Sequence, residues 1–153
     1  DLAGMLKRVD IIPPSLAIAQ AAEESGWGTS RFAREGNALF GQRVYKPGRT
    51  GIIPKERGAG KSFRVRSFDQ LIDCVKAYAH NLNSHSAYND FRNARSKLRA
   101  EDGEINGYGL AGALLRYSER GKDYIDTIRL IIRANRLGVF DEESFGSTDD
   151  PDA

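Results

Sequence analysis

The sequence predicts an α+β fold that is mostly α-helical and carries one small β-hairpin lobe. Several segments place apolar residues at helical spacing, which indicates amphipathic helices. Between Leu39 and Arg66 the chain is instead rich in glycine and proline, which end regular elements. Two short β-like runs, Phe40 to Tyr45 and Ser62 to Val65, flank this stretch. We expect one domain over residues 1–143, followed by a polar, disordered tail at residues 144–153.

The first predicted helix runs from Ser15 to Ser25. A pair of prolines precedes it, and proline suits the first helical turn because no backbone N–H partner is needed there. A Gly-Trp-Gly stretch follows it, and glycine accepts the left-handed conformation in which many helices end. A second, short helix is expected from Thr29 to Arg34, closed by Gly36.

Four helices are predicted between Ser67 and the tail. Ser67 is expected to cap a helix whose apolar residues recur at helical spacing: Leu71, Ile72, Val75, Tyr78, Ala79 and Leu82. Within it, Cys74 is interpreted as a small buried hydrophobe. Further helices are predicted near Ser86–Arg99, Gly109–Tyr117 and Lys122–Asn135. The first of these carries basic residues that we interpret as a solvated face: Arg92, Arg95, Lys97 and Arg99.

Composition and charge exclude several classes of function. The net charge of +2 suits an anionic polymer but is too small to indicate nucleic-acid binding. A single cysteine excludes a disulfide within the chain and a cysteine-based metal site. The two histidines have no partner cluster, so we expect neither a metal nor another cofactor. No apolar run approaches the roughly 20 residues that span a bilayer.

Glu24 is the first candidate for chemistry because it occupies the last turn of the first predicted helix. The helix dipole disfavours an ionised carboxylate there, and a nearby Trp27 ring would add desolvation. Both effects raise the pKa, as a glycosidase acid requires. A solvated glutamate at a helix end is the alternative, and Glu23, on the apolar stripe, competes equally from periodicity alone.

Two motifs resemble those of the bacterial peptidoglycan glucosaminidases, a lysozyme-like group that includes flagellar-rod muramidases and Bax-like proteins. Residues 24–28 read Glu-Ser-Gly-Trp-Gly after an alanine-rich run, and residues 36–41 read Gly-Asn-Ala-Leu-Phe-Gly. The family pattern has Asn-Asn-Leu-Phe-Gly in the second motif, so Ala38 departs from it, as Glu23 departs from an apolar position. The resemblance implies that Glu24 is the general acid.

The same resemblance places a second glutamate in the β lobe. Glu56 is the one acidic residue between Leu39 and Ser67. Its neighbours Lys55 and Arg57 should keep it ionised, which suits a base or an electrostatic stabiliser. A plain surface charge is the alternative, and some glycosidases use the acetamido group of the substrate instead.

Candidate substrate-binding residues are mostly aromatic, because aromatic faces and hydroxyls suit sugar rings: Trp27, Asn37, Phe40, Tyr88, Tyr117 and Tyr124. For Phe40 and Tyr124, a position in the hydrophobic core is the favoured interpretation. Tyr117 resembles the first tyrosine of a family Tyr-x-x-Asp-x-x-Tyr pattern, although the run here is one residue longer. Tyr88 resembles the tyrosine of a family Asn-x-x-Tyr stretch.

The resemblance predicts a hydrolase of peptidoglycan glycan strands, an endo-β-N-acetylglucosaminidase or a muramidase. A lytic transglycosylase with one catalytic glutamate is the alternative enzyme, and a non-catalytic wall-binding module is the alternative from another class. The substrate implies the periplasm or secretion. The chain opens on Asp1 and shows no signal peptide, and we expect it to be part of a larger protein. The loop from Tyr45 to Lys61 is expected to be mobile without ligand and to form one wall of a cleft.

Overall fold

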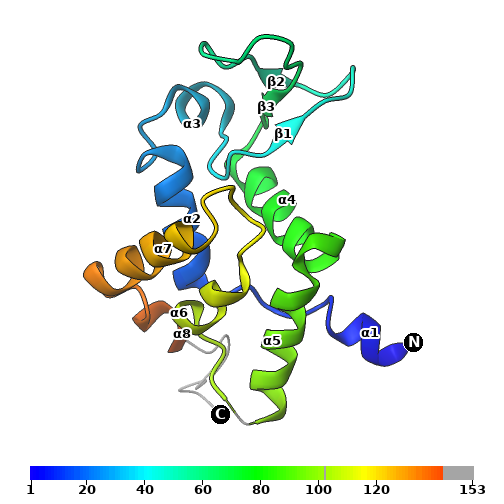
Figure 1. Ribbon diagram of the computed structural model, residues 1–153, viewed down its shortest axis with the longest axis vertical. Coiled ribbons are helices and arrows are strands. Elements are labelled where there is room, and N and C mark those ends of the chain that lie inside the picture. Colours follow the sequence, from blue (N-terminus) through cyan, green and yellow to red (C-terminus); the bar gives the residue numbers. More distant parts are fainter. Residues whose placement is uncertain (102, 143–153) are drawn as a thin grey trace, which may run out of the picture.

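A computed structural model describes residues 1–101 and 103–142, and the predicted tail lies outside the described residues (Figure 1). Helices make up most of that part of the chain, with one small sheet near one end. The elements in chain order are α1 (Leu2–Leu6), α2 (Pro14–Ser25), α3 (Arg31–Gly36), β1 (Arg43–Val44), β2 (Gly51–Ile52), β3 (Arg64–Arg66), α4 (Leu71–Ser84), the 3-10 turn η1 (Ser86–Tyr88), α5 (Asn89–Ala100), α6 (Gly107–Leu110), the 3-10 turn η2 (Ala111–Ala113), α7 (Lys122–Ala134) and α8 (Val139–Glu142). The predicted α+β class is confirmed.

Helix α2 is the central element of the helical part. It contacts α6, α7 and α8, and Leu16, Ala19 and Gln20 on it are completely buried. Pro14 is its first residue, and Gly26 ends it in the left-handed conformation with φ 57°. These are the boundary signals read from the sequence, which act locally and therefore hold in the folded chain.

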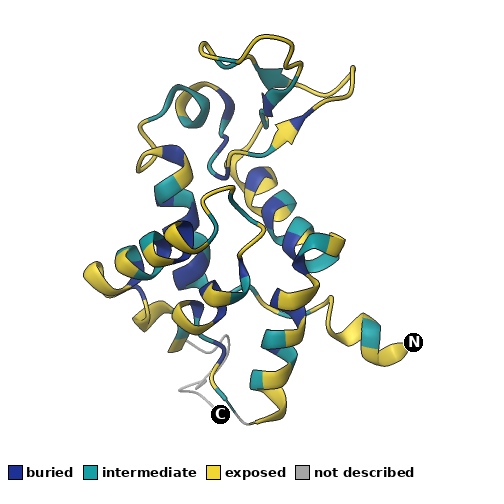
Figure 2. Ribbon diagram, in the orientation of Figure 1, coloured by how far each residue is buried: buried dark blue, intermediate teal, exposed yellow. Residues whose placement is uncertain are grey.

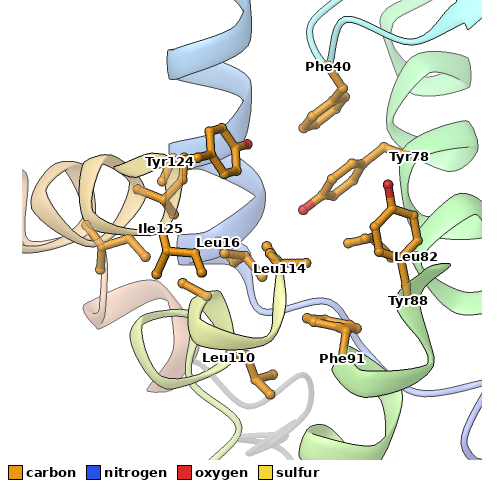
Figure 3. Close-up of a cluster of buried hydrophobic side chains, with 14 of the residues drawn as sticks. Leu16, Phe40, Tyr78, Leu82, Tyr88, Phe91, Leu110, Leu114, Tyr124 and Ile125 are labelled. Carbon is orange, nitrogen blue, oxygen red and sulfur yellow. The ribbon is translucent and has the colours of Figure 1, made fainter. Parts of the chain in front are cut away.

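The hydrophobic core lies between α2, α4, α5 and α7. Figure 3 shows Leu16, Tyr78, Phe91 and Ile125 pointing into one cluster from these four helices. Figure 2 shows buried residues along the inner faces of the helices and exposed residues along their outer faces. The cluster therefore fixes how α2 and α4 lie relative to one another.

Two predictions about α4 are wrong. Gln70, not Ser67, is the N-cap of α4, because Ser67 continues the sheet edge, where its N–H donates to the Thr50 carbonyl oxygen. The buried stripe also differs from the predicted one, since it consists of Cys74, Tyr78 and Leu82, spaced four residues apart. Apolar residues of the first turns remain exposed instead: Leu71, Ile72 and Val75.

The β lobe is a three-stranded antiparallel sheet rather than a two-stranded hairpin. Strand β3 lies in the middle, in the order β1-β3-β2, and Val65 pairs with Arg43 on one side and Ile52 on the other. Strand β2 was missed because it lies inside the glycine-rich stretch. Gly51 is required there, because an added Cβ would lie 2.9 Å from the Arg64 Cβ.

The predicted helix Gly109–Tyr117 is also wrong. Helix α6 starts at Gly107 and ends at Leu110, and η2 follows it. Several glycines weaken helix formation here, and Gly107 packs so tightly that an added Cβ would lie 2.1 Å from the Ser15 Oγ. The chain therefore leaves the helix early, and Tyr117 lies in a turn.

Two arginines of the predicted solvated face on α5 are buried. The Arg95 side chain is completely buried and donates to the carbonyl oxygens of Lys7 (2.7 Å) and Ile11 (2.8 Å). Arg92 likewise donates to the Leu82 carbonyl oxygen at 2.7 Å. Both guanidinium groups satisfy backbone carbonyls that helix ends and loops leave without partners.

Replacing Arg95 with methionine should lower the free energy of unfolding by about 3 kcal/mol, because a completely buried guanidinium group and its hydrogen bonds to the Lys7 and Ile11 carbonyl oxygens are lost. Urea denaturation at neutral pH would measure the change. Lys97→Met is the matched control, since its side chain is 75% exposed, and it should change stability by less than about 0.5 kcal/mol. Equal effects of the two substitutions would contradict the role given to Arg95.

Candidate active site

Glu24 lies in the wall of a cavity of about 660 Å³ at the end of α2. Phe40, Gly41 and Tyr117 line the same cavity. Gly41 has φ 64°, and a Cβ there would lie 3.0 Å from Glu24 Oε2. Glycine is therefore needed at this position for the backbone to approach the carboxylate, and this contact brings the two sequence motifs together.

The surroundings of Glu24 raise its pKa above the usual value for a glutamate. Although the residue is exposed towards the cavity, crowding protein atoms remove part of the water around the carboxylate, and this desolvation is the largest cause. The negative charge of Glu23 acts in the same direction. The Tyr124 hydroxyl, Arg120 and Arg43 act in the opposite direction. The carboxyl group consequently keeps its proton to a higher pH than a free glutamate.

A buried chain of hydrogen bonds lies behind Glu24. The Tyr78 hydroxyl donates to Gln20 Oε1, and Gln20 Nε2 donates to the Tyr124 hydroxyl oxygen at 3.0 Å. Because the Tyr124 hydroxyl oxygen accepts from Gln20, its own proton is left for another acceptor. That acceptor is Glu24, which lies one helical turn after Gln20. Figure 3 shows Tyr78 and Tyr124 reaching towards each other from α4 and α7. This chain of hydrogen bonds holds the last turn of α2, which carries Glu24, in place.

Aromatic rings form a continuous layer under the cavity. The Tyr117 ring stacks on Tyr124 with 5.6 Å between centroids and lies 5.9 Å from Tyr88. Phe40 stacks on Tyr78 at 3.9 Å. Because sugar rings present apolar faces, such a layer can support a chain of them.

The cavity at Glu24 continues into two others. A cavity of about 490 Å³ shares Phe40, Gly41, Arg43 and Tyr117 with it and adds Tyr88. A third, of about 830 Å³, shares Arg66, Ala77 and His80 with the second. Because neighbouring cavities share lining residues, the three lie in a row between the sheet and the helices, and we call this row of cavities the cleft.

The structure brings four of the predicted site residues to this cleft and places one beneath it. Glu24, Phe40, Tyr88 and Tyr117 line it, whereas Tyr124 is 1% exposed and lies below Tyr117. The alternative interpretation of Tyr124 as a core residue is therefore the one that its burial supports, although its hydroxyl still serves the Glu24 neighbourhood.

The other three predicted site residues lie away from the cleft. The Trp27 side chain is 61% exposed and does not line the Glu24 cavity, so the expected desolvation of Glu24 by the Trp27 ring is not seen. Asn37 donates its amide to the Phe68 carbonyl oxygen at 3.0 Å and joins α3 to the segment before α4. Glu56 is exposed in a turn between β2 and β3, and it does not line any of the three cavities.

Sequence reasoning missed the charged residues around Glu24. Arg43, Arg116, Glu119 and Arg120 line its cavity, and Arg120 forms an ion pair with Glu23 at 2.8 Å. Arg116, Glu119 and Arg120 reach the cavity because the turn after η2 meets the end of α2, and Arg43 reaches it from strand β1. No local pattern reveals either meeting. One feature of the sequence could have identified Gln20, because it is a polar residue on the buried side of an alanine-rich helix.

Among residues 1–101 and 103–142, no three histidine, cysteine or acidic side chains gather as metal ligands would. None of the described helices is both long and apolar enough to cross a membrane.

Comparisons with known proteins identify similar sequences over most of the chain. The Glucosaminidase family, described as mannosyl-glycoprotein endo-beta-N-acetylglucosaminidase, matches residues 2–137. Protein bax of Escherichia coli (strain K12) is 43% identical over 120 residues, which make up 78% of this chain and 42% of that protein. The chain thus spans less than half the length of this curated relative. The family match includes Glu24 and all residues that line its cavity.

Replacing Glu23 with glutamine should lower the pKa of Glu24. The substitution removes a neighbouring negative charge that disfavours ionisation, and it also releases Arg120 from its ion pair. Carboxyl carbon-13 NMR titration would measure the shift. Glu101→Gln removes the same charge at the end of α5 and should leave the titration of Glu24 unchanged. An unchanged pKa in both variants would show that Glu23 does not act on Glu24.

Proposed function

We propose that this chain, which belongs to the glucosaminidase family, hydrolyses glycosidic bonds of peptidoglycan strands with Glu24 as the general acid. The observation that carries the proposal is a carboxyl group of raised pKa in the wall of a long cleft with an aromatic floor. The bond cleaved is that of an endo-acting β-N-acetylglucosaminidase or muramidase. Such a substrate places the activity in the cell envelope or outside the cell.

In the proposed reaction Glu24 transfers its proton to the glycosidic oxygen as the bond from that oxygen to the anomeric carbon breaks. Positive charge develops on the anomeric carbon and the ring oxygen. Water then adds to the anomeric carbon as the new hydroxyl group, and the proton that it releases restores the acid form of Glu24. Desolvation serves this step because it raises the pKa of Glu24, so the carboxyl group keeps the proton it must donate to a higher pH than a free glutamate would. The burial that raises the pKa of the Tyr117 hydroxyl also keeps it protonated, so it can donate to the substrate beside Glu24.

A second group must stabilise the positive charge, and two routes are available. In the first, a carboxylate approaches the anomeric carbon, either Glu56 after movement of its loop or Glu119, which already lines the cavity. In the second, the acetamido group of the substrate attacks the anomeric carbon. The position of Glu56 outside the cleft also favours a lytic transglycosylase as the second candidate function, because that reaction needs one glutamate.

Glu24→Gln should reduce cleavage of purified peptidoglycan by at least about 10²-fold, because glutamine keeps the size and polarity but cannot supply the proton. Mass spectrometry of the digest would measure product and also identify the reaction. Reducing-end sugars indicate hydrolysis, and anhydro-muramic ends indicate transglycosylation. Wild-type rates in the folded variant would remove Glu24 from the mechanism, and no product from the unmodified chain would favour a wall-binding module.

Glu56→Gln and Glu119→Gln separate the routes for charge stabilisation. If a carboxylate stabilises the cation, one of the two variants should lose about 10²-fold or more in kcat, while the other changes little. Loss with Glu56→Gln would mean that the loop from Tyr45 to Lys61 closes over substrate, and hydrogen exchange with a bound glycan should then show protection of the loop. Normal rates in both variants would leave the acetamido group as the stabilising group.

A further inference from the structure

Basic side chains line the middle cavity of the cleft, which is the one of about 490 Å³. Arg43 and Arg66 line it from strands β1 and β3, and His80 and His85 line it from the side of α4. None of the described residues that line this cavity is an aspartate or a glutamate. It adjoins the Glu24 cavity, with which it shares Arg43 and Tyr117. An anionic group would therefore find favourable charge directly beside the proposed point of cleavage.

The two arginines are held in place without being neutralised. The Arg43 guanidinium lies 4.2 Å from the centroid of the Phe63 ring, and that of Arg66 lies 4.6 Å from that of Phe68. Neither guanidinium has a hydrogen bond or an ion pair with the residues that the structure describes. Arg64, on the same strand as Arg66, differs because it donates to the Lys46 carbonyl oxygen at 3.0 Å. Stacking on a ring orients a guanidinium and leaves its N–H donors available.

A third donor belongs to a residue that lines the same cavity and has no partner among the described residues. Gln42 lines the cavity, and its Nε2 is buried without a hydrogen-bond partner among the described residues. A buried donor left unpaired costs free energy, so such donors normally have a partner. An acceptor oxygen of a ligand in this cavity would supply one. The arginines and this amide would thus all donate to the same kind of ligand, an anionic group with several oxygens.

We propose that the middle cavity binds a carboxylate of the peptide that peptidoglycan carries on its glycan strands, with Arg66 as its main anchor. The assignment rests on the proposed function, which supplies the glycan in the neighbouring cavity. A carboxylate accepts two parallel N–H bonds from one guanidinium, and a peptide branch leaves the glycan beside the sugar rings. The site makes the chain selective for strands that still carry charged peptides.

Binding measurements on the Glu24→Gln protein test this assignment without consuming the ligand. Three soluble glycan fragments of equal length are compared by calorimetry: one without peptide, one with a peptide whose carboxylates are free, and one whose peptide carboxylates are amidated. The fragment with free carboxylates should bind about tenfold more tightly than the amidated one. Adding Arg66→Gln should bring this ratio close to one, whereas adding Arg64→Gln, which removes the same charge from the same strand, should preserve it.

The outcomes separate this inference from the proposed function. Binding of none of the three fragments would overturn the proposed function, and equal binding of all three would overturn only the carboxylate site. A ratio lost equally with Arg64→Gln and Arg66→Gln would mean general charge attraction and would also overturn the site. Arg66→Lys covers the case in which Arg66→Gln unfolds the sheet, because lysine keeps the charge without the guanidinium fork. The ratio of the two affinities should then be intermediate. An undiminished ratio would contradict the role of Arg66 as the main anchor.

Discussion

The hydrogen bonds of Gln20 are the constraint on which the candidate site depends. This fully buried amide joins Tyr78 of α4 to Tyr124 of α7 across the interior of the molecule. Its acceptor and donor ends are different atoms, so the two tyrosine hydroxyls receive different roles. Each group would cost free energy if left unpaired in the core. The three helices therefore meet in one arrangement, and that arrangement brings the last turn of α2 to the cleft.

Glu24 combines two properties that usually oppose each other. A carboxyl group that is held by donors tends to ionise, and one that is freely buried tends to keep its proton but lacks a fixed position. Here desolvation and Glu23 raise the pKa, while the Tyr124 hydroxyl and Arg120 limit the rise. The group is positioned from beneath and remains open towards the cleft. An acid that must release a proton at a defined point needs both conditions.

The cleft itself arises where two kinds of structure meet. Turns of the helical part supply its aromatic floor, including Tyr88 and Tyr117, and the small sheet supplies cationic side chains along its edge, Arg43 and Arg66. A sheet of such short strands has little core of its own and depends on the helices. Gly36 shows this dependence, since an added Cβ there would lie 2.8 Å from the Ile52 Cδ1. Tight packing of α3 on the sheet thus helps to fix where the sheet lies.

The sequence by itself determined the fold class, the bounds of α2 and α7 to within a residue or so, and the family motifs around Glu24. These depend on helical periodicity, prolines and glycines, which act between neighbours in the chain. The burial of Arg95 and the third strand, β2, were not predicted because both depend on partners distant in sequence. Gln20 lies 58 residues from Tyr78 and 104 from Tyr124. Only the tertiary structure decided which side chains share a cavity with Glu24, because packing of whole helices sets those distances.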